Sequence, residues 1–399
     1  MVAGLLMAAV LAQTQEVTLV FGGDVIPHDP VKYAARVHGR FVREGDAGVP
    51  QNNHGWDHVF GPLSRIFREA DEAVVNLETP VGYFAKPETG EMVFHAEPDL
   101  LNGLKASGVT VATFANNHCL DQHREGIVST REELRRAGLA SAGSDVTEAA
   151  SWQPLILERH GLRIGILPFT RFLNGFHNAK TPDAPHVPLV HYDDDHDSGG
   201  HSEAELLAYV SEAASRVDAL IVVPHWGDEY KPLPKLADRA LAQSLLKAGA
   251  LAIIGMHPHV LQPTEKHIAP DGRAALVAFS LGNLVSNQDL ADAESPKREG
   301  LLLQVRLARR EGRVRIVSVV PIPLHTENRL ATGKRRNIQP LVLADEIAAL
   351  RERLVEIDAR GLPQTSSERR QVNTRLEQML AREQRIMRTL EPDVTGAPW

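Results

Sequence analysis

The sequence has one cysteine, Cys119, among its 399 residues. A single thiol cannot build an intramolecular disulfide framework or a cysteine-based zinc ribbon, so neither can stabilise this fold. The chain also lacks excess positive charge, with a formal net charge of -8 and a pI of about 6.1. A general nucleic-acid binder normally presents a basic face, so we expect no nucleic-acid partner.

P-loop, G-x-S-x-G, H-E-x-x-H and dinucleotide-binding motifs are absent as well, which excludes several common enzyme classes.

Long apolar runs are also missing. Met1–Ala12 is apolar, but a membrane-spanning helix needs about 20 such residues. The run fits the apolar region of a signal peptide, and Val10–Ala12 supplies small residues for cleavage, although no Lys or Arg precedes it. We therefore predict a signal peptide over residues 1–15 and export to the periplasm or cell surface. A buried N-terminal segment of a cytoplasmic protein is the alternative.

From about Val17 to Gly255, apolar strand-like runs alternate with segments of helical period, which predicts an α/β fold. Predicted strands include Val17–Phe21, Ala73–Leu77, Val109–Ala115, Ala219–Val223 and Leu251–Ile254, with a hairpin across His160-Gly161. Three further strand-like runs follow: Ala274–Ser280, Leu301–Ala308 and Val314–Val320. Leu341–Leu390 is rich in Ala, Leu, Glu and Arg at helical period. These patterns predict a main domain over residues 16–330 and a C-terminal helical extension over residues 331–399.

Five of the predicted strands end in residues that can hold a divalent cation. In open α/β sheets, ligands bind at the carboxyl ends of strands, so strand ends far apart in sequence converge in space. Carboxylate, amide and imidazole groups are the ligand types that divalent metals use. The residues at these ends are Asp24, Glu78, Asn117 with His118, His225, and His257 with His259. The pattern therefore predicts a metal centre.

His118 and Asp121 are the candidate catalytic pair. His118 can donate a proton to a leaving group, and Asp121, three residues later, can fix the imidazole tautomer. The neighbouring Cys119 suggests a Cys–His nucleophile, but no oxyanion glycine pattern follows, which favours an inert thiol. The acidic, histidine-containing stretch His191–His201 reads either as a metal-binding loop or, preferably, as a solvated one.

Each candidate also has an ordinary structural interpretation. Asp24 and Asn117 suit turns, Glu78 precedes a proline-set turn, and paired histidines such as His257 and His259 can be satisfied core residues. The metal hypothesis depends on their shared position at strand ends, not on any one of them.

Taken in order, several segments resemble the CapA family of capsule and poly-γ-glutamate synthesis proteins, whose domain is similar to the calcineurin-like metallophosphatases. The matching segments are Phe21–Ile26, Val75–Val81, Phe94–His118, His225–Tyr230, Gly255–Gln262 and Phe279–Val285. The resemblance covers roughly Val17 to Leu324. It implies a metallophosphatase-like β-sandwich flanked by helices, with the C-terminal helices as an appendage.

The resemblance also assigns roles. Asp24, Glu78, Asn117, His225, His257 and His259 would hold one or two divalent ions, with Mn, Fe or Zn as the candidates, and Glu78 would be the bridging carboxylate. His118 would be the general acid. The implied function is a phosphoesterase-like, metal-dependent hydrolase of surface-polymer biosynthesis that acts on an anionic polymer or phosphoester beside a membrane-bound synthase.

The chain departs from the metallophosphatase pattern at several positions. Ile26 occupies the place of a ligand histidine, for which His28 is the candidate replacement. Met256 stands where the family often has His, and His123 where it often has Gly. These departures favour a second hypothesis, a non-catalytic accessory module that binds an anionic polymer or a membrane-bound synthase. A cytosolic nucleotidase on the same fold is a third.

Overall fold

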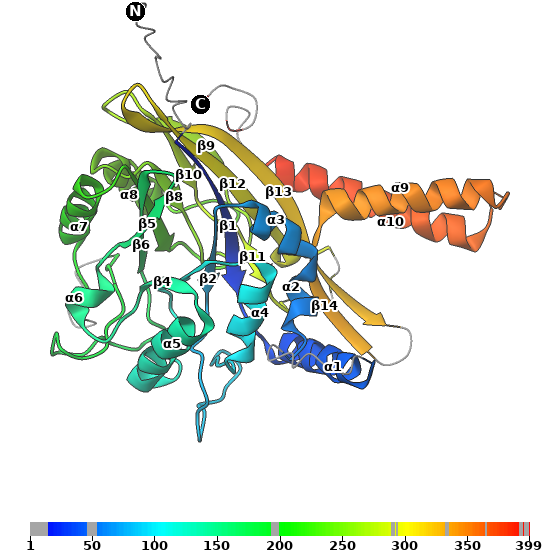
Figure 1. The fold of residues 1–399 in the computed structure, drawn as a ribbon, viewed down its shortest axis with the longest axis horizontal. Helices are drawn as coiled ribbons and strands as arrows, with labels where there is room; N and C mark the ends of the chain where they lie inside the picture. The colour runs from blue at the N-terminus through cyan, green and yellow to red at the C-terminus, as the bar shows by residue number, and fades with distance from the viewer. Residues whose placement is uncertain are drawn as a thin grey trace, which may run out of the picture.

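The computed structural model describes residues 15–45, 54–192, 199–288, 292, 294–331, 335–363, 365–390, 394 and 399. The signal peptide predicted over residues 1–15 lies outside this part of the chain, apart from Gln15. Two mixed β-sheets pack face to face with helices on their outer sides (Figure 1). The predicted α/β class, a sandwich flanked by helices, is confirmed.

The first sheet has eight strands in the order β14-β13-β12-β1-β2-β3-β4, with β11 also paired to β1. β1 to β4 are mutually parallel, and β12 to β14 are antiparallel. Their bounds are β1 (Glu16–Val25), β2 (Glu72–Leu77), β3 (Val111–Phe114), β4 (Ala140–Gly143), β11 (Asn283–Val285), β12 (Glu299–Arg310), β13 (Arg313–Ala331) and β14 (Arg335–Val342).

The second sheet has six strands in the order β5-β6-β7-β8-β10-β9, parallel from β6 to β10 and antiparallel at both edges. Its strands are β5 (Leu155–Arg159), β6 (Leu162–Thr170), β7 (Ala219–His225), β8 (Ala252–Ile254), β9 (Thr264–Ile268) and β10 (Ala274–Ala278). The hairpin predicted across His160-Gly161 is β5–β6.

The alternation of side chains in β1 shows how this strand contributes to two hydrophobic cores. Val17, Leu19 and Phe21 enter the core between the two sheets, whereas Val20 and Val25 face the outer helices. Successive residues of a strand point to opposite faces, so one apolar strand serves two cores. β1 is thereby fixed in the middle of the fold, and its carboxyl end with it.

Helices cover both outer faces. The first sheet is covered by α1 (Asp29–Gly45), α2 (Trp56–Phe60), α3 (Ser64–Glu69), α4 (Asp99–Ser107) and α5 (His123–Ala137), and the second by α7 (Glu203–Ser215) and α8 (Leu236–Lys247). A short α6 (Glu148–Ser151) precedes β5. None of the helices in the described residues is long and apolar enough to cross a membrane.

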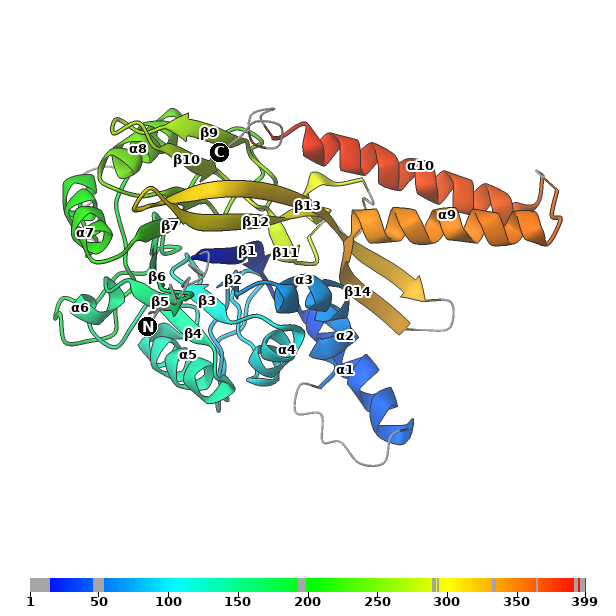
Figure 2. The same ribbon diagram turned by 45° about the horizontal axis from the view of Figure 1, so that its top comes forward.

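The C-terminal helices begin at Leu343, close to the start of the helical period predicted from Leu341. Residues 335–342, just before them, form β14 and extend the first sheet. α9 (Leu343–Ala359) and α10 (Ser367–Met387) then form an antiparallel pair that projects from the body (Figures 1 and 2). Leu343 and Ile386 anchor its base in the central core.

Candidate metal centre

All eight predicted site residues are buried and lie at or just beyond the carboxyl ends of parallel strands. None is more than 5% exposed: Asp24, Glu78, Asn117, His118, Asp121, His225, His257 and His259. Five of them lie at or after the ends of β1, β2 and β3 of the first sheet, and three lie at or after the ends of β7 and β8 of the second. The two sheets therefore face each other across one shared group of polar residues.

Glu78 lies at the middle of this group. Its two carboxylate oxygens are buried and have no hydrogen-bond partner. Oε1 lies 3.4 Å from Nε2 of His225, 3.8 Å from Nε2 of His259 and 4.0 Å from Nε2 of His118. A buried carboxylate without hydrogen bonds is costly, and a cation is the usual partner that offsets the cost.

Asn117, His225 and His257 form one set of close contacts near Glu78. Nε2 of His225 is 2.7 Å from Oδ1 of Asn117 and 3.1 Å from Nδ1 of His257. A tetrahedral cation with ligand bonds of about 2.0–2.2 Å holds its ligand atoms roughly 3.3–3.6 Å apart. The observed separations are close to that spacing, so these atoms need little movement to enclose an ion.

Asp24 and His259 form a second set of close contacts. Nδ1 of His259 is 3.4 Å from Oδ2 of Asp24 and 3.1 Å from Oδ1 of Asn283. With Nδ1 held by oxygen acceptors, Nε2 is the nitrogen that faces Glu78, which is the usual arrangement of a metal-binding histidine.

The donor atoms form two groups that share Glu78. The candidate ligand atoms of Glu78, His257 and His259 lie within 4.8 Å of one another, and so do those of Asp24, Glu78 and His225. Glu78 belongs to both groups, so the residues present fit one or two divalent cations held around this carboxylate.

The turn after β8 aims two of these histidines inward. His257 and His259 have φ values of 98° and 55°, a region that non-glycine residues seldom adopt. Such conformations cost roughly 1–3 kcal/mol each and persist where the surroundings enforce them, often at functional sites. One enforcing contact is the hydrogen bond that the His257 N–H donates to Oδ2 of Asp24, at 3.1 Å.

His118 and Asp121 form a tight pair beside the group. Nδ1 of His118 lies 2.7 Å from Oδ2 of Asp121, and the same oxygen accepts the N–H of Phe94. Because a carboxylate can only accept, Nδ1 of His118 carries the proton and Nε2 is directed toward Glu78. The Phe94 ring packs 4.3 Å from the imidazole and fixes its plane.

The ionisation of the group follows from its burial and charges. Burial alone would lower the pKa of His259, but the nearby Glu78 and Asp24 carboxylates outweigh burial and raise it to about 9. Burial, reinforced by positive charge on His225 and His259, lowers the pKa of His257 well below its usual value. Burial would raise the pKa of Asp24, yet its hydrogen bond with His259 and the histidine charges lower it.

His28, the candidate replacement for a histidine at the place of Ile26, makes contacts of its own. Its Nδ1 accepts the N–H of Asn287 at 3.2 Å, and its ring packs edge-on to Phe94. Among the described residues, His28 is in neither group of candidate ligands. The side of the centre next to Asp24 therefore has one imidazole fewer than the metallophosphatase pattern.

Three asparagines that sequence reasoning did not assign support the ligands. Asn76 donates to Oδ1 of Asp24 at 2.7 Å, Asn283 contacts His259, and Asn174 accepts from Nδ2 of Asn117 at 3.1 Å. Asn76 and Asn283 lie inside segments that carry the family resemblance, which is the signal that could have found them. Asn174 lies in a loop without such a signal.

The remaining sequence alternatives can be compared with the structure. Burial raises the pKa of the Cys119 thiol to about 12, which agrees with an inert cysteine. Residues 193–198 of the acidic loop lie outside the described residues. At its ends, His191 is buried and its Nε2 accepts the N–H of Gly200 at 3.1 Å, and His201 contacts Glu148.

Comparison with known proteins places the chain among capsule proteins. The chain is 29% identical over 279 residues to the PGA biosynthesis protein CapA of Bacillus subtilis (strain 168), covering 68% of this chain and 66% of that protein. It is 27% identical over 319 residues to the capsule biosynthesis protein CapA of Bacillus anthracis, covering 78% of this chain and 68% of the relative. The chain thus spans about two thirds of the length of these relatives.

Solved structures give weaker matches. The calcineurin-like phosphoesterase YfkN of Bacillus subtilis matches with a TM-score of 0.40 at 12% identity, covering 78% of this chain and 91% of that one. A hypothetical protein from Thermus thermophilus matches with a TM-score of 0.41 at 14% identity, covering 77% of this chain and 99% of that one.

A family profile matches more than half of the chain. The sequence profile described as bacterial capsule synthesis protein PGA_cap matches residues 18–288, which include every predicted site residue. The chain belongs to the PGA_cap family of bacterial capsule synthesis proteins, as the resemblance to CapA predicted.

Proposed function

We propose that this protein is a metal-dependent hydrolase of phosphoesterase type that acts in the biosynthesis of capsule, poly-γ-glutamate or another surface polymer. The observation that carries the proposal is the buried, unpartnered carboxylate of Glu78 among imidazoles from both sheets. The polymer context comes from the relatives, whose names refer to PGA and capsule biosynthesis.

One or two divalent ions, with Mn, Fe or Zn as the candidates, would be held by Asp24, Glu78, Asn117, His225, His257 and His259. A bound ion would supply Lewis-acid polarisation of the bond that is cleaved. Because these ligands come from two sheets, the fold itself fixes their separation.

His118 supplies proton transfer. Protonated at Nε2, it can give that proton to the leaving oxygen, while Asp121 holds the other nitrogen and stabilises the imidazolium. Phe94 excludes water from one face of the ring. General acid catalysis of this kind contributes about 100- to 10,000-fold to a rate.

The partners that suit this reading are an anionic polymer or phosphoester as substrate and a membrane-bound polymer synthase. Export remains part of the proposal, supported by the apolar run Met1–Ala12. N-terminal sequencing of the mature protein tests it, because an intact Met1 would contradict cleavage.

The activity test compares the protein with its His118→Ala variant on bis(p-nitrophenyl) phosphate in the presence of Mn²⁺. We expect kcat to fall about 100-fold or more, since general acid catalysis is lost. The control is His267→Ala, on the edge strand β9 and in neither group of candidate ligands, which should keep the original rate. Equal rates for the protein and His118→Ala would remove His118 from the mechanism.

A second candidate function is a non-catalytic accessory module. Ile26 in place of a ligand histidine favours it, and a Mycobacterium tuberculosis (strain H37Rv) relative, 27% identical over 266 residues, is named a "Probable polyglutamine synthesis accessory protein". Metal retention without turnover of any ester would select this function over hydrolysis.

A further inference from the structure

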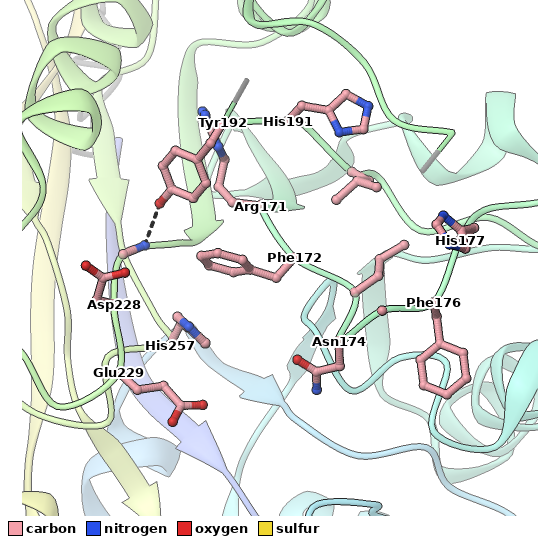
Figure 3. Close-up of a pocket in the computed structure, with 14 residues that line it drawn as sticks. Arg171, Phe172, Asn174, Phe176, His177, His191, Tyr192, Asp228, Glu229 and His257 are labelled. Atoms are coloured by element: carbon pink, nitrogen blue, oxygen red, sulfur yellow. Dashed lines mark hydrogen bonds between the residues drawn. The ribbon is translucent and has the colours of Figure 1, made fainter. Parts of the chain in front are cut away.

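A cavity of about 570 Å³ adjoins the metal centre. His257 lines it, so the cavity and the candidate ligands share one imidazole (Figure 3). Phe172 packs 4.8 Å from His257, and Tyr192 packs 5.4 Å from Phe172. A cavity of this size accommodates a small molecule or the end of a chain, held directly beside the centre.

Arg171 is a buried cation in the lining of this cavity. It follows β6, and its backbone N–H donates to the carbonyl of His225 at 3.0 Å, which ties the cavity to the centre. Its side chain is 1% exposed, and Nη1 pairs with Glu203 at 2.8 Å. Nε and Nη2 are buried without a hydrogen-bond partner. Unsatisfied guanidinium donors of this kind favour a ligand that brings an anionic acceptor.

Tyr192 holds Arg171 in place. The guanidinium carbon lies 3.9 Å from the Tyr192 ring centre. The Tyr192 hydroxyl donates to Asp238 at 2.8 Å and accepts the N–H of Gly227 at the same distance. The Arg171 guanidinium therefore has a fixed orientation in the lining of the cavity.

The cavity lining also includes two acidic residues. Asp228 and Glu229 lie on the side of the cavity away from His191 (Figure 3). Asp228 pairs with Lys235 at 2.7 Å. Glu229 lies close enough to the centre for its charge to act on His259. Acidic side chains that line the same cavity as a guanidinium favour a ligand that carries both signs of charge.

We propose that this cavity binds a zwitterionic α-amino acid head, with its carboxylate at Arg171 and its ammonium at Glu229. The amino end of a γ-linked glutamyl chain presents this head, because the peptide bond uses the side-chain carboxyl and leaves the α-carboxyl free. An α-linked chain uses the α-carboxyl in its first peptide bond and lacks the group. The inference rests on the proposed role in polymer synthesis and names the part of the polymer that is recognised.

Isothermal titration with two isomeric dipeptides tests the proposal. γ-Glutamylglycine should bind at least about tenfold more tightly than α-glutamylglycine, which has the same net charge. Arg171→Gln and Glu229→Gln should each weaken γ-glutamylglycine binding about tenfold or more. Arg163→Gln is the matched control, because Arg163 lies on the same strand β6 with a half-exposed side chain at its other end.

Equal affinity for the two isomers would overturn the proposal, and so would unchanged binding in Glu229→Gln, which alters a half-buried residue and spares the buried Arg171. Free glutamate carries the same head, so binding of glutamate with exclusion of γ-glutamylglycine would also overturn the assignment to a chain end. Metal content is measured on the same samples. Metal retention without dipeptide binding contradicts only this inference, whereas dipeptide binding without metal contradicts only the hydrolase.

Discussion

Both carboxylate oxygens of Glu78 are buried without a hydrogen-bond partner, and the imidazoles of three histidines lie within 4.0 Å of Oε1. In a metal-free protein, His259 offsets part of this negative charge by staying protonated, with its pKa raised to about 9. A cation that binds between them must displace that proton, because imidazole coordinates only in its neutral form. Metal binding and proton release are therefore coupled at this residue.

We expect Mn²⁺ or Zn²⁺ to release about one proton per chain on binding near pH 7.5. The folded-state pKa of His259 lies above its usual value of 6.5, so its protonation stabilises the metal-free fold fully below pH 6.5. This contribution is lost as the pH rises through about 9. Calorimetry in buffers of different ionisation enthalpy measures the proton, and an apparent enthalpy that does not depend on the buffer would contradict the coupling.

Asn174 gives a second test at this scale. Its Oδ1 accepts from Nδ2 of Asn117, which leaves Oδ1 of Asn117 directed at His225. Asn174→Gly removes the acceptor while tolerating the local φ of 50°, and should weaken metal affinity about tenfold or more. His177→Ala, in the same loop, is the control. Unchanged affinity in Asn174→Gly would show that Asn117 needs no such support.

Individual site residues could be predicted where a metal-binding residue type stood at the end of a predicted strand. Asp24, Glu78 and the histidines are unusual residue types for strand ends, so their position alone suggested ligands. Asn174 was not predictable, because asparagine is typical of ordinary loops and its role depends on a contact 57 residues away. The same holds for Arg171, whose unpartnered nitrogens are visible only in three dimensions.

At the scale of elements, the close approach of β1 and β11 positions Asp24. A Cβ on Gly23 would lie 1.9 Å from the carbonyl oxygen of Gly282, so only glycine allows these two backbones to pair. The pairing sets Asp24 opposite Asn283, which contacts His259. The strand end is thus held in register with the ligands of the second sheet.

Gly23→Ala should therefore lower the free energy of unfolding by about 2 kcal/mol or more, since the clash is with backbone, and should reduce metal retention. Gly61→Ala is the matched control. A Cβ there meets nothing within 4 Å and the backbone is helical, so stability should stay the same or rise slightly. Denaturant unfolding measures both, and equal stability of the two variants would contradict the close-approach argument.

Strands with strong apolar patterns were predicted well, and weaker ones were not. β4 has the sequence Ala-Ser-Ala-Gly and β14 is largely polar, so neither carries a hydrophobic signal. β13 runs to Ala331, well past the predicted end at Val320. β13 continues through Pro321 and Pro323, and β14 pairs with β13 only from Leu324 onward, so the prolines interrupt no ladder on that side. The helical segment before β2 is divided at Gly61-Pro62 into α2, a 3-10 turn and α3.

At the scale of the whole molecule, the site exists because two sheets meet with the carboxyl ends of their parallel strands at one place. Asp24, Glu78 and Asn117 come from the first sheet, and His225 and the His257–His259 turn come from the second. Apolar periodicity predicted the strands but could not assign them to separate sheets, because buried parallel strands resemble one another. The family resemblance supplied that architecture.

The claim most directly open to measurement is that the two sheets jointly hold a divalent ion at Glu78. Elemental analysis of the protein after equilibration with Mn²⁺ and desalting tests it beside the nearly isosteric variant Glu78→Gln. We predict about one or two ions per chain in the protein and a large loss in Glu78→Gln, since the shared carboxylate is gone. Absence of metal from the protein, or equal metal content in both, would contradict the account.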